Sequence, residues 1–146
     1  MRVRTNRWTH EISPNGDGTG FVVERQRGVE GATDRHFGKI LAINMRERTL
    51  ALDETFFICG VISIEEKMKI RTNHAVYEVA LSGNGNDFVV EKLEDVEGVA
   101  CAATVSHFEG KVLTIDMNKK TLLLNAGTGF FGVGFFSIRG IISIES

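Results

Sequence analysis

The chain carries one stretch of sequence twice, and this repeat restricts its fold more than any other feature. Residues 1–6 (MRVRTN) return as 68–73 (MKIRTN), an offset of 68 − 1 = 67, and FVVE at 21–24 returns at the same offset. Later matches shift to an offset of 111 − 39 = 72 and then of 140 − 60 = 80, where GVISIE returns as GIISIE. The second repeat therefore contains two insertions, one of 72 − 67 = 5 and one of 80 − 72 = 8 residues.

The two repeats, residues 1–66 and 67–146, set the expected domain organisation. A unit of about sixty residues buries only about 60% of its unfolded surface and is marginal alone, so the repeats are expected to share a core or to oligomerise. Solenoids usually need three or more repeats. We therefore expect a pseudo-two-fold pair of small domains, with one fused domain as the alternative.

Alternation of apolar and polar residues indicates β-strands in both repeats. It is clearest in 39–45 and 111–117, each followed by a polar hairpin tip and a second strand. The glycine-rich segments 15–18 and 83–86 have the composition of tight hairpins, and no helical pattern is sustained. The expected fold is all-β, with each repeat forming a small antiparallel β-barrel or sandwich of about five strands.

The composition is that of a soluble globular protein, with 42% hydrophobic and 25% charged residues. A net charge of −2 gives no basic excess for sequence-independent binding to phosphate backbones. The most apolar stretch, 127–144, is interrupted by glycines, polar residues and an arginine, so no membrane span is expected, and residues 1–7 do not begin a secretory signal. Cys59 and Cys101 are not equivalent in the two repeats, which favours free thiols in a reducing compartment, the cytoplasm.

No catalytic or metal-binding motif stands out in the sequence. Residues 13–18 (SPNGDG) begin as a calcium loop does, with Glu24 as a candidate later ligand, but the composition favours an ordinary turn. His36 and His107 are interpreted as equivalent, and neither has a partner at zinc-ligand spacing. Nucleophile elbows and phosphate-binding loops are absent from the sequence as well. We expect no metal, no cofactor and no enzymatic activity.

The eight-residue insertion gives the second repeat a segment that the first lacks. Residues 127–136 (GTGFFGVGFF) contain four of the chain's ten phenylalanines, namely Phe130, Phe131, Phe135 and Phe136. A feature present in one repeat is not required by the shared fold. Three roles are open: filling the groove between the repeats, forming an interface between copies of the chain, or lining a pocket for a planar ligand.

Two segments of the second repeat resemble the motifs of Sm-like RNA-binding proteins. Residues 109–116 (EGKVLTID) are similar to that family's G-x-h-x-x-h-D strand, where h is apolar, and residues 136–144 (FSIRGIISI) contain its I-R-G tripeptide. The resemblance implies a small β-barrel in which the second repeat contacts RNA. The first repeat has Asn44 in place of the aspartate and Cys59 in place of the arginine, so it lacks this set.

A shorter likeness is to the trp RNA-binding attenuation protein, a small β protein that forms rings. Residues 87–90 (DFVV) and 110–112 (GKV) resemble its opening strand and a later strand. This likeness implies assembly of several copies. The tryptophan-binding pattern of that protein is not matched.

These features lead to three functional hypotheses. The first is a non-enzymatic binding or self-assembly module, homo-oligomeric, whose specific surface is the Phe-Gly insertion and the groove beside it. The alternative is a binder of RNA or of a small nucleotide ligand, in which Arg139, Lys111 and the insertion converge on one pocket and His107 is a further candidate residue. The third, an enzyme, requires one cleft that gathers Asp34, Arg35, His36 and Glu109.

Overall fold

The computed structural model describes residues 1–16, 18–26, 35–95, 107–129 and 132–145, with side chains described for all of these except 126–129 and 132–135. Within these ranges every regular element is a β-strand, which confirms the all-β prediction. The first half of the chain, residues 1–66, contains β1 (Arg2–Thr5), β2 (Thr9–Pro14), β3 (Phe21–Gln26), β4 (Arg35–Gly38), β5 (Ile40–Asn44), β6 (Thr49–Leu52), β7 (Phe56–Cys59) and β8 (Val61–Glu65). The second half, residues 67–146, contains β9 (Met68–Thr72), β10 (Ala75–Leu81), β11 (Phe88–Asp95), β12 (His107–Gly110), β13 (Val112–Asp116), β14 (Thr121–Gly129), β15 (Gly132–Arg139) and β16 (Ile141–Glu145).

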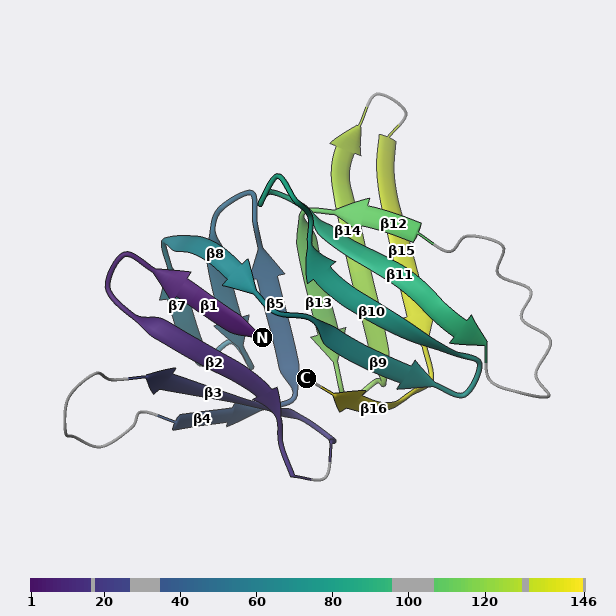
Figure 1. Cartoon of the computed structure of the whole chain (residues 1–146), viewed down its shortest axis with the longest axis horizontal. Helices are drawn as coiled ribbons and strands as arrows, with labels where there is room; N and C mark the ends of the chain where they lie inside the picture. The colour runs from purple at the N-terminus through teal and green to yellow at the C-terminus, as the bar shows by residue number, and fades with distance from the viewer. Residues whose placement is uncertain (17, 27–34, 96–106, 130–131, 146) are drawn as a thin grey trace.

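The strands form three antiparallel sheets (Figure 1). One five-stranded sheet has the order β4-β3-β2-β1-β8, and the other has the order β12-β11-β10-β9-β16. The six-stranded sheet has the order β15-β14-β13-β5-β6-β7, so each half contributes three of its strands. Both five-stranded sheets lie over the same face of the six-stranded sheet (Figure 1).

The prediction of about five strands per repeat is too low, because long strands are kinked and serve two sheets. Lys39 alone separates β4 from β5, and Gly60 alone separates β7 from β8; Lys111 and Gly140 are the corresponding breaks in the second half. Gly60 and Gly140 have φ angles of 73° and 76°, a left-handed conformation that glycine adopts without strain. At both edges of each five-stranded sheet, a kink connects the edge strand to a strand of the six-stranded sheet.

Two more glycines are required because the chain passes very close to a neighbour at the kink. A Cβ on Gly38 would lie 2.6 Å from Cγ of Leu52, and a Cβ on Gly110 would lie 2.8 Å from the carbonyl oxygen of Asn125. Neither position leaves room for a side chain. Gly38, Gly60 and their counterparts Gly110 and Gly140 are therefore the residues that permit the strands to bend.

One hydrophobic core runs through both halves. At its centre β5 pairs with β13, so that Leu41 lies opposite Ile115 and Ile43 lies opposite Leu113. All four side chains are at most 1% exposed. Burial of one such side chain contributes about 1.5–3 kcal/mol, so this pairing is a strong link between the halves. Sharing a core is one of the two arrangements that the short repeats were expected to need.

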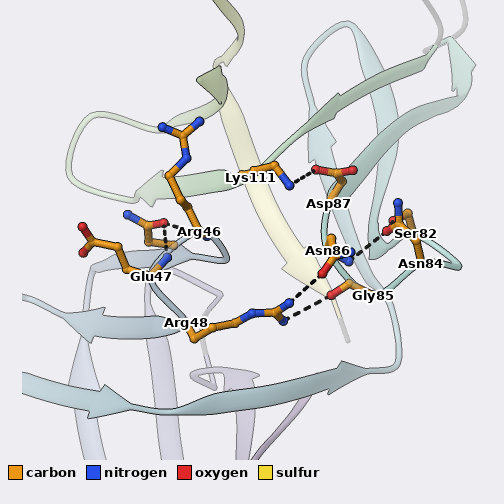
Figure 2. Close-up of polar contacts among 10 residues, drawn as sticks. Arg46, Glu47, Arg48, Ser82, Asn84, Gly85, Asn86, Asp87 and Lys111 are labelled. Atoms are coloured by element: carbon orange, nitrogen blue, oxygen red, sulfur yellow. Dashed lines mark hydrogen bonds and ion pairs between the residues drawn. The ribbon is translucent and has the colours of Figure 1, made fainter. Parts of the chain in front are cut away.

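A polar contact outside the core also joins the halves (Figure 2). Arg48, in the turn between β5 and β6, donates from Nη1 to the carbonyl oxygen of Gly85 at 3.3 Å and from Nη2 to Oδ1 of Asn86 at 2.6 Å. Gly85 and Asn86 lie in the turn between β10 and β11. The hairpin tip of the first half thus holds a turn of the second half by two hydrogen bonds.

Candidate functional site

The four phenylalanines of the insertion are described to different extents. Phe130 and Phe131 lie outside the described residues. Phe135 is described by its backbone, which lies on β15 opposite Asn125. Phe136 is described in full, and it is partly buried against the core.

Phe136 belongs to an aromatic cluster that has a counterpart in the first half. Its ring stacks on Phe108, with the centroids 4.9 Å apart, and meets Tyr77 edge-on at 6.3 Å. The first half has an aromatic cluster of the same geometry, in which a stacked pair is 3.9 Å apart and an edge-on pair 6.2 Å apart; its members are Phe56, His36 and His10. Because both halves have this cluster, the role of Phe136 is to fill the core rather than to form a special surface.

The interpretation of His36 and His107 as equivalent is wrong by one position. His36 lies opposite Val23, whereas the residue opposite the matching Val90 is Phe108. The pairing of β11 with β12 continues without a bulge, so the extra residue of the second repeat precedes β12 instead of interrupting it. The two halves therefore have no duplicated histidine site.

His107 is part of an exposed ionic cluster. Its Nδ1 lies 3.0 Å from Oε1 of Glu91, and its Nε2 lies 3.2 Å from Oε1 of Glu109. The hydrogen bond with Glu91, followed by that with Glu109, raises the pKa of His107 above its usual value of 6.5. In the first half Arg35 pairs with Glu24 at 3.2 Å in the same place between the strands. His107 thus occupies the position of a structural cation.

Lys111 and Arg139 do not converge, contrary to the RNA-binding hypothesis. Lys111 forms an ion pair with Asp87 at 3.2 Å (Figure 2) and donates its backbone N–H to the carbonyl of Asn125. Arg139 lies opposite Thr121, at the other end of β14. On β14, Thr121 lies beside Arg139 and Asn125 lies beside Lys111. Four residue steps along the strand, or about 13 Å, separate Thr121 from Asn125. Lys111 and Arg139 therefore belong to different surfaces.

Arg139 lines a cavity of about 410 Å³ beside the kink between β15 and β16. The other lining residues are Thr72, Asn73, His74, Tyr77, Ser137, Ile138 and Gly140. None of them carries a carboxylate, and within the described residues neither Arg139 nor His74 has an ion-pair partner. The cavity therefore offers an unneutralised guanidinium, an imidazole and polar side chains, which suits an anionic ligand.

The turn that borders this cavity is common to both halves, whereas Arg139 has no charged counterpart in the first half. Oγ1 of Thr72 accepts hydrogen bonds from the backbone N–H groups of His74 and Ala75, and Thr5 does the same for the corresponding turn of the first half. At the position of Arg139 the first half has Cys59, which is an exposed free thiol. The sequence difference between Arg139 and Cys59 thus gives this cavity a guanidinium where the first half has a thiol.

The β14–β15 hairpin is the largest difference in shape between the halves. β14 and β15 have nine and eight residues, whereas β6 and β7, at the corresponding places, have four each. In Figure 1 the described ends of β14 and β15 project past β12, beyond the body of the sheets. β15 is the outermost strand of the six-stranded sheet, so its outer side has no strand partner within the described part of the chain.

The residues proposed for catalysis or metal binding do not lie together in one site. Arg35 and His36 lie on β4, Glu109 lies on β12 of the other five-stranded sheet, and Asp34 lies outside the described residues. Among the residues that the structure describes, no group of three or more His, Cys, Asp or Glu side chains is arranged to hold a metal ion. The same residues include no helix of the length and apolarity needed to cross a membrane.

Comparison of the chain with protein-family models, with curated proteins and with solved structures finds no match.

Proposed function

We propose that this protein is a non-enzymatic self-assembly module: a pseudo-two-fold pair of β units, produced by tandem duplication and joined through one shared sheet, that binds other copies of itself through the β14–β15 hairpin. The observation that carries the proposal is the long β15 edge, which extends beyond the body of the sheets and has no strand partner in the described chain.

The pseudo-two-fold arrangement is supported by the pairing at the centre of the six-stranded sheet. Ala42 lies opposite Thr114, and these positions are related by the repeat offset of 114 − 42 = 72. On either side, the N–H of Met45 donates to the carbonyl of Lys111 and the N–H of Met117 donates to the carbonyl of Lys39, both at 2.8 Å. A two-fold axis at the Ala42–Thr114 pair exchanges these two hydrogen bonds.

Assembly through the hairpin is supported by the properties of sheet edges. An edge strand presents a row of unpaired backbone N–H and C=O groups that can pair with another chain, and proteins usually keep such edges short or covered. β7, at the opposite edge of the six-stranded sheet, has four residues, but β15 has eight. The insertion thus lengthens the edge that corresponds to a short one in the first half, which favours pairing with a second chain.

The chain offers a matched test of the hairpin. Replacing residues 125–135 with the Asp-Glu-Thr turn of residues 53–55 shortens the second hairpin by eight residues to the length of the first. We expect this variant to keep the far-UV circular dichroism of a β protein and to have a lower mass by light scattering. Phe37→Ser, which removes a phenylalanine that is 64% exposed on β4, is the control and is expected to keep the mass of the unaltered chain. An unchanged mass in the shortened variant would overturn assembly through the hairpin.

The second candidate function is binding of RNA or of a small nucleotide, and the cavity at Arg139 favours it. The resemblance of residues 136–144 to Sm-like proteins supports the same candidate, because Arg139 is the arginine of the I-R-G tripeptide. Binding through phosphate is expected to weaken as salt rises.

This second candidate is tested by fluorescence anisotropy with labelled oligouridylate and by calorimetry with ADP at low ionic strength. Arg139→Ala is expected to reduce binding at least tenfold, whereas Arg46→Ala, which removes an exposed arginine from the turn shown in Figure 2, leaves it unchanged. Equal loss in both variants would mean diffuse attraction to basic surface and would exclude a specific site at Arg139.

A further inference from the structure

The six-stranded sheet has one face that no described strand covers. Its inner residues, such as Leu50 and Leu122, are fully buried, whereas Phe57 and Leu123 on the opposite face are 61% and 41% exposed. Directly opposite residues of antiparallel strands place their side chains on the same face. One row of side chains therefore crosses this uncovered face from β15 to β7, and it consists of Ser137, Leu123, Thr114, Ala42, Ala51 and Phe57.

This outer row contains no charged residue, although 25% of the chain is charged. The row on one side of it is also uncharged, and its members with described side chains are Asn125, Val112, Asn44, Thr49 and Cys59. The row on the other side contains Arg139, Thr121, Asp116 and Ile40, so charged residues border the outer row there. Antiparallel sheets that face water normally place polar and charged residues on the solvated side. The two uncharged rows have the composition of an interface centre, from which charged residues are depleted, and the row with Arg139 and Asp116 has that of a polar rim.

The sizes of the side chains in the outer row identify the partner as a second copy of the chain. Read from β15 to β7, the row is Ser, Leu, Thr, Ala, Ala, Phe. A second copy can face the first through a two-fold axis that is parallel to the strands. The outer row of the partner then lies over the outer row of the first copy with its residues in the opposite order. Phe57 then lies over the partner's Ser137, Leu123 over the partner's Ala51, and Thr114 over the partner's Ala42. Each contact combines a large with a small side chain, so the two faces can approach evenly.

The extent of the face is that of a small, reversible contact. Six strands spaced about 4.8 Å apart and about four to five residues long cover about 29 Å by 15 Å, or about 450 Å² in each copy. Two copies would bury about 900 Å², which is the size of transient interfaces. Isologous contacts of this kind are the commonest in homo-oligomers.

We propose that two copies of the chain pack face to face through the outer row, on a two-fold axis parallel to the strands, as two aligned sheets about 10 Å apart. The inference rests on the proposed function, self-assembly, and adds a second contact to that of the hairpin.

A charge exchange tests both the face and its orientation. In the unaltered dimer Leu123 lies over the partner's Ala51, while within one chain the two residues are separated by β13 and β5 and do not meet. Leu123→Lys alone and Ala51→Glu alone each bury a charge, so each is expected to lower the mass about twofold in sedimentation equilibrium. The double variant Leu123→Lys with Ala51→Glu places opposite charges together at both contacts and is expected to restore the mass. Ile62→Lys, at a 56% exposed position on β8 outside the face, is the control and keeps the mass.

The possible results separate this inference from the proposed function. If both single variants keep the mass of the unaltered chain, or if the double variant stays at the lower mass, the face-to-face contact is overturned. When that result is combined with a lower mass in the variant with the shortened hairpin, self-assembly stands and only this contact falls. A single-chain mass for the unaltered protein overturns both. Thermal unfolding followed by circular dichroism shows which variants fold.

Discussion

The substitution Gly110→Ala tests the claim that glycines permit the strands to bend between sheets. Gly110 is buried at the kink between β12 and β13, and a Cβ there would lie 2.8 Å from the carbonyl oxygen of Asn125 and 2.9 Å from Cγ of Leu124. The first neighbour is a backbone atom that also accepts a hydrogen bond from Lys111, so it cannot move without disturbing the pairing at the kink. Overpacking of this kind costs about 1–3 kcal/mol.

The matched control is Gly83→Ala. A Cβ on Gly83 meets no heavy atom within 4 Å, and its φ is not positive. Alanine there reduces the conformational entropy of the unfolded chain and is expected to add about 0.4–1 kcal/mol of stability. The two alanine variants thus differ in sign, although the same methyl group is added.

Urea unfolding at equilibrium, followed by fluorescence of Trp8 and by circular dichroism, measures both variants. With an unchanged m-value, the midpoint is expected to fall for Gly110→Ala and to rise for Gly83→Ala. In thermal unfolding, each kcal/mol corresponds to about 2–4 °C for a chain of this length. If Gly110→Ala is as stable as Gly83→Ala, the close approach at the kink does not exist and the reasoning is refuted.

Three further substitutions probe the contacts around the sites. NMR titration should give His107 a pKa above 6.5, and Glu91→Gln should lower that pKa. Because the pKa is raised in the folded protein, the pairing with Glu91 stabilises the protein below about pH 6.5, and this stabilisation is lost as the pH rises through the folded pKa. Arg48→Ala should lower the free energy of unfolding by about 0.5–1.5 kcal/mol for each hydrogen bond lost, while Arg46→Ala leaves it unchanged. Phe136→Ala should cost about 3 kcal/mol in the same urea assay because it removes a ring from the aromatic cluster, and a loss below about 1 kcal/mol would contradict that packing.

The sequence predicted the strands well because alternation of apolar and polar residues directly reflects which face is buried. The alternating segments 39–45 and 111–117 contain β5 and β13, and residues 15, 16 and 18 and the segment 83–86 lie between strands. The strand count was too low because a single residue, Lys39 or Lys111, separates strands of two different sheets. So short a break contains no turn sequence that would mark the end of a strand.

The pairing of β5 with β13 lay beyond sequence reasoning. Each strand is apolar on one face, but that pattern is equally consistent with two separate barrels or with one shared sheet. Which arrangement forms depends on backbone hydrogen bonds at the strand edges, such as that from Met45 to Lys111. The pattern of side chains in the sequence does not reveal which backbone groups pair. The histidine register failed for a related reason, because the repeated His-Phe pair looked like an anchor while the pairing of Val90 with Phe108 sets the register.

The candidate sites were predicted in part. Arg139 is predictable from the sequence because it replaces Cys59 in an otherwise matching segment, and it lines the cavity beside the kink. The resemblance also predicts Lys111 in the same pocket because Lys111 lies in the other motif, but the length of β14 separates the two residues. The outer row was missed, because a row across a sheet combines residues from six strands whose order is set by tertiary pairing.

Self-assembly is the central claim, and sedimentation equilibrium of the full chain over a wide range of protein concentrations tests it most directly. One chain has a mass of 16.1 kDa. The account predicts a mass that is a whole multiple of this value, at least twice as large, and that falls when the β14–β15 hairpin is shortened. A mass of a single chain at every concentration would contradict it.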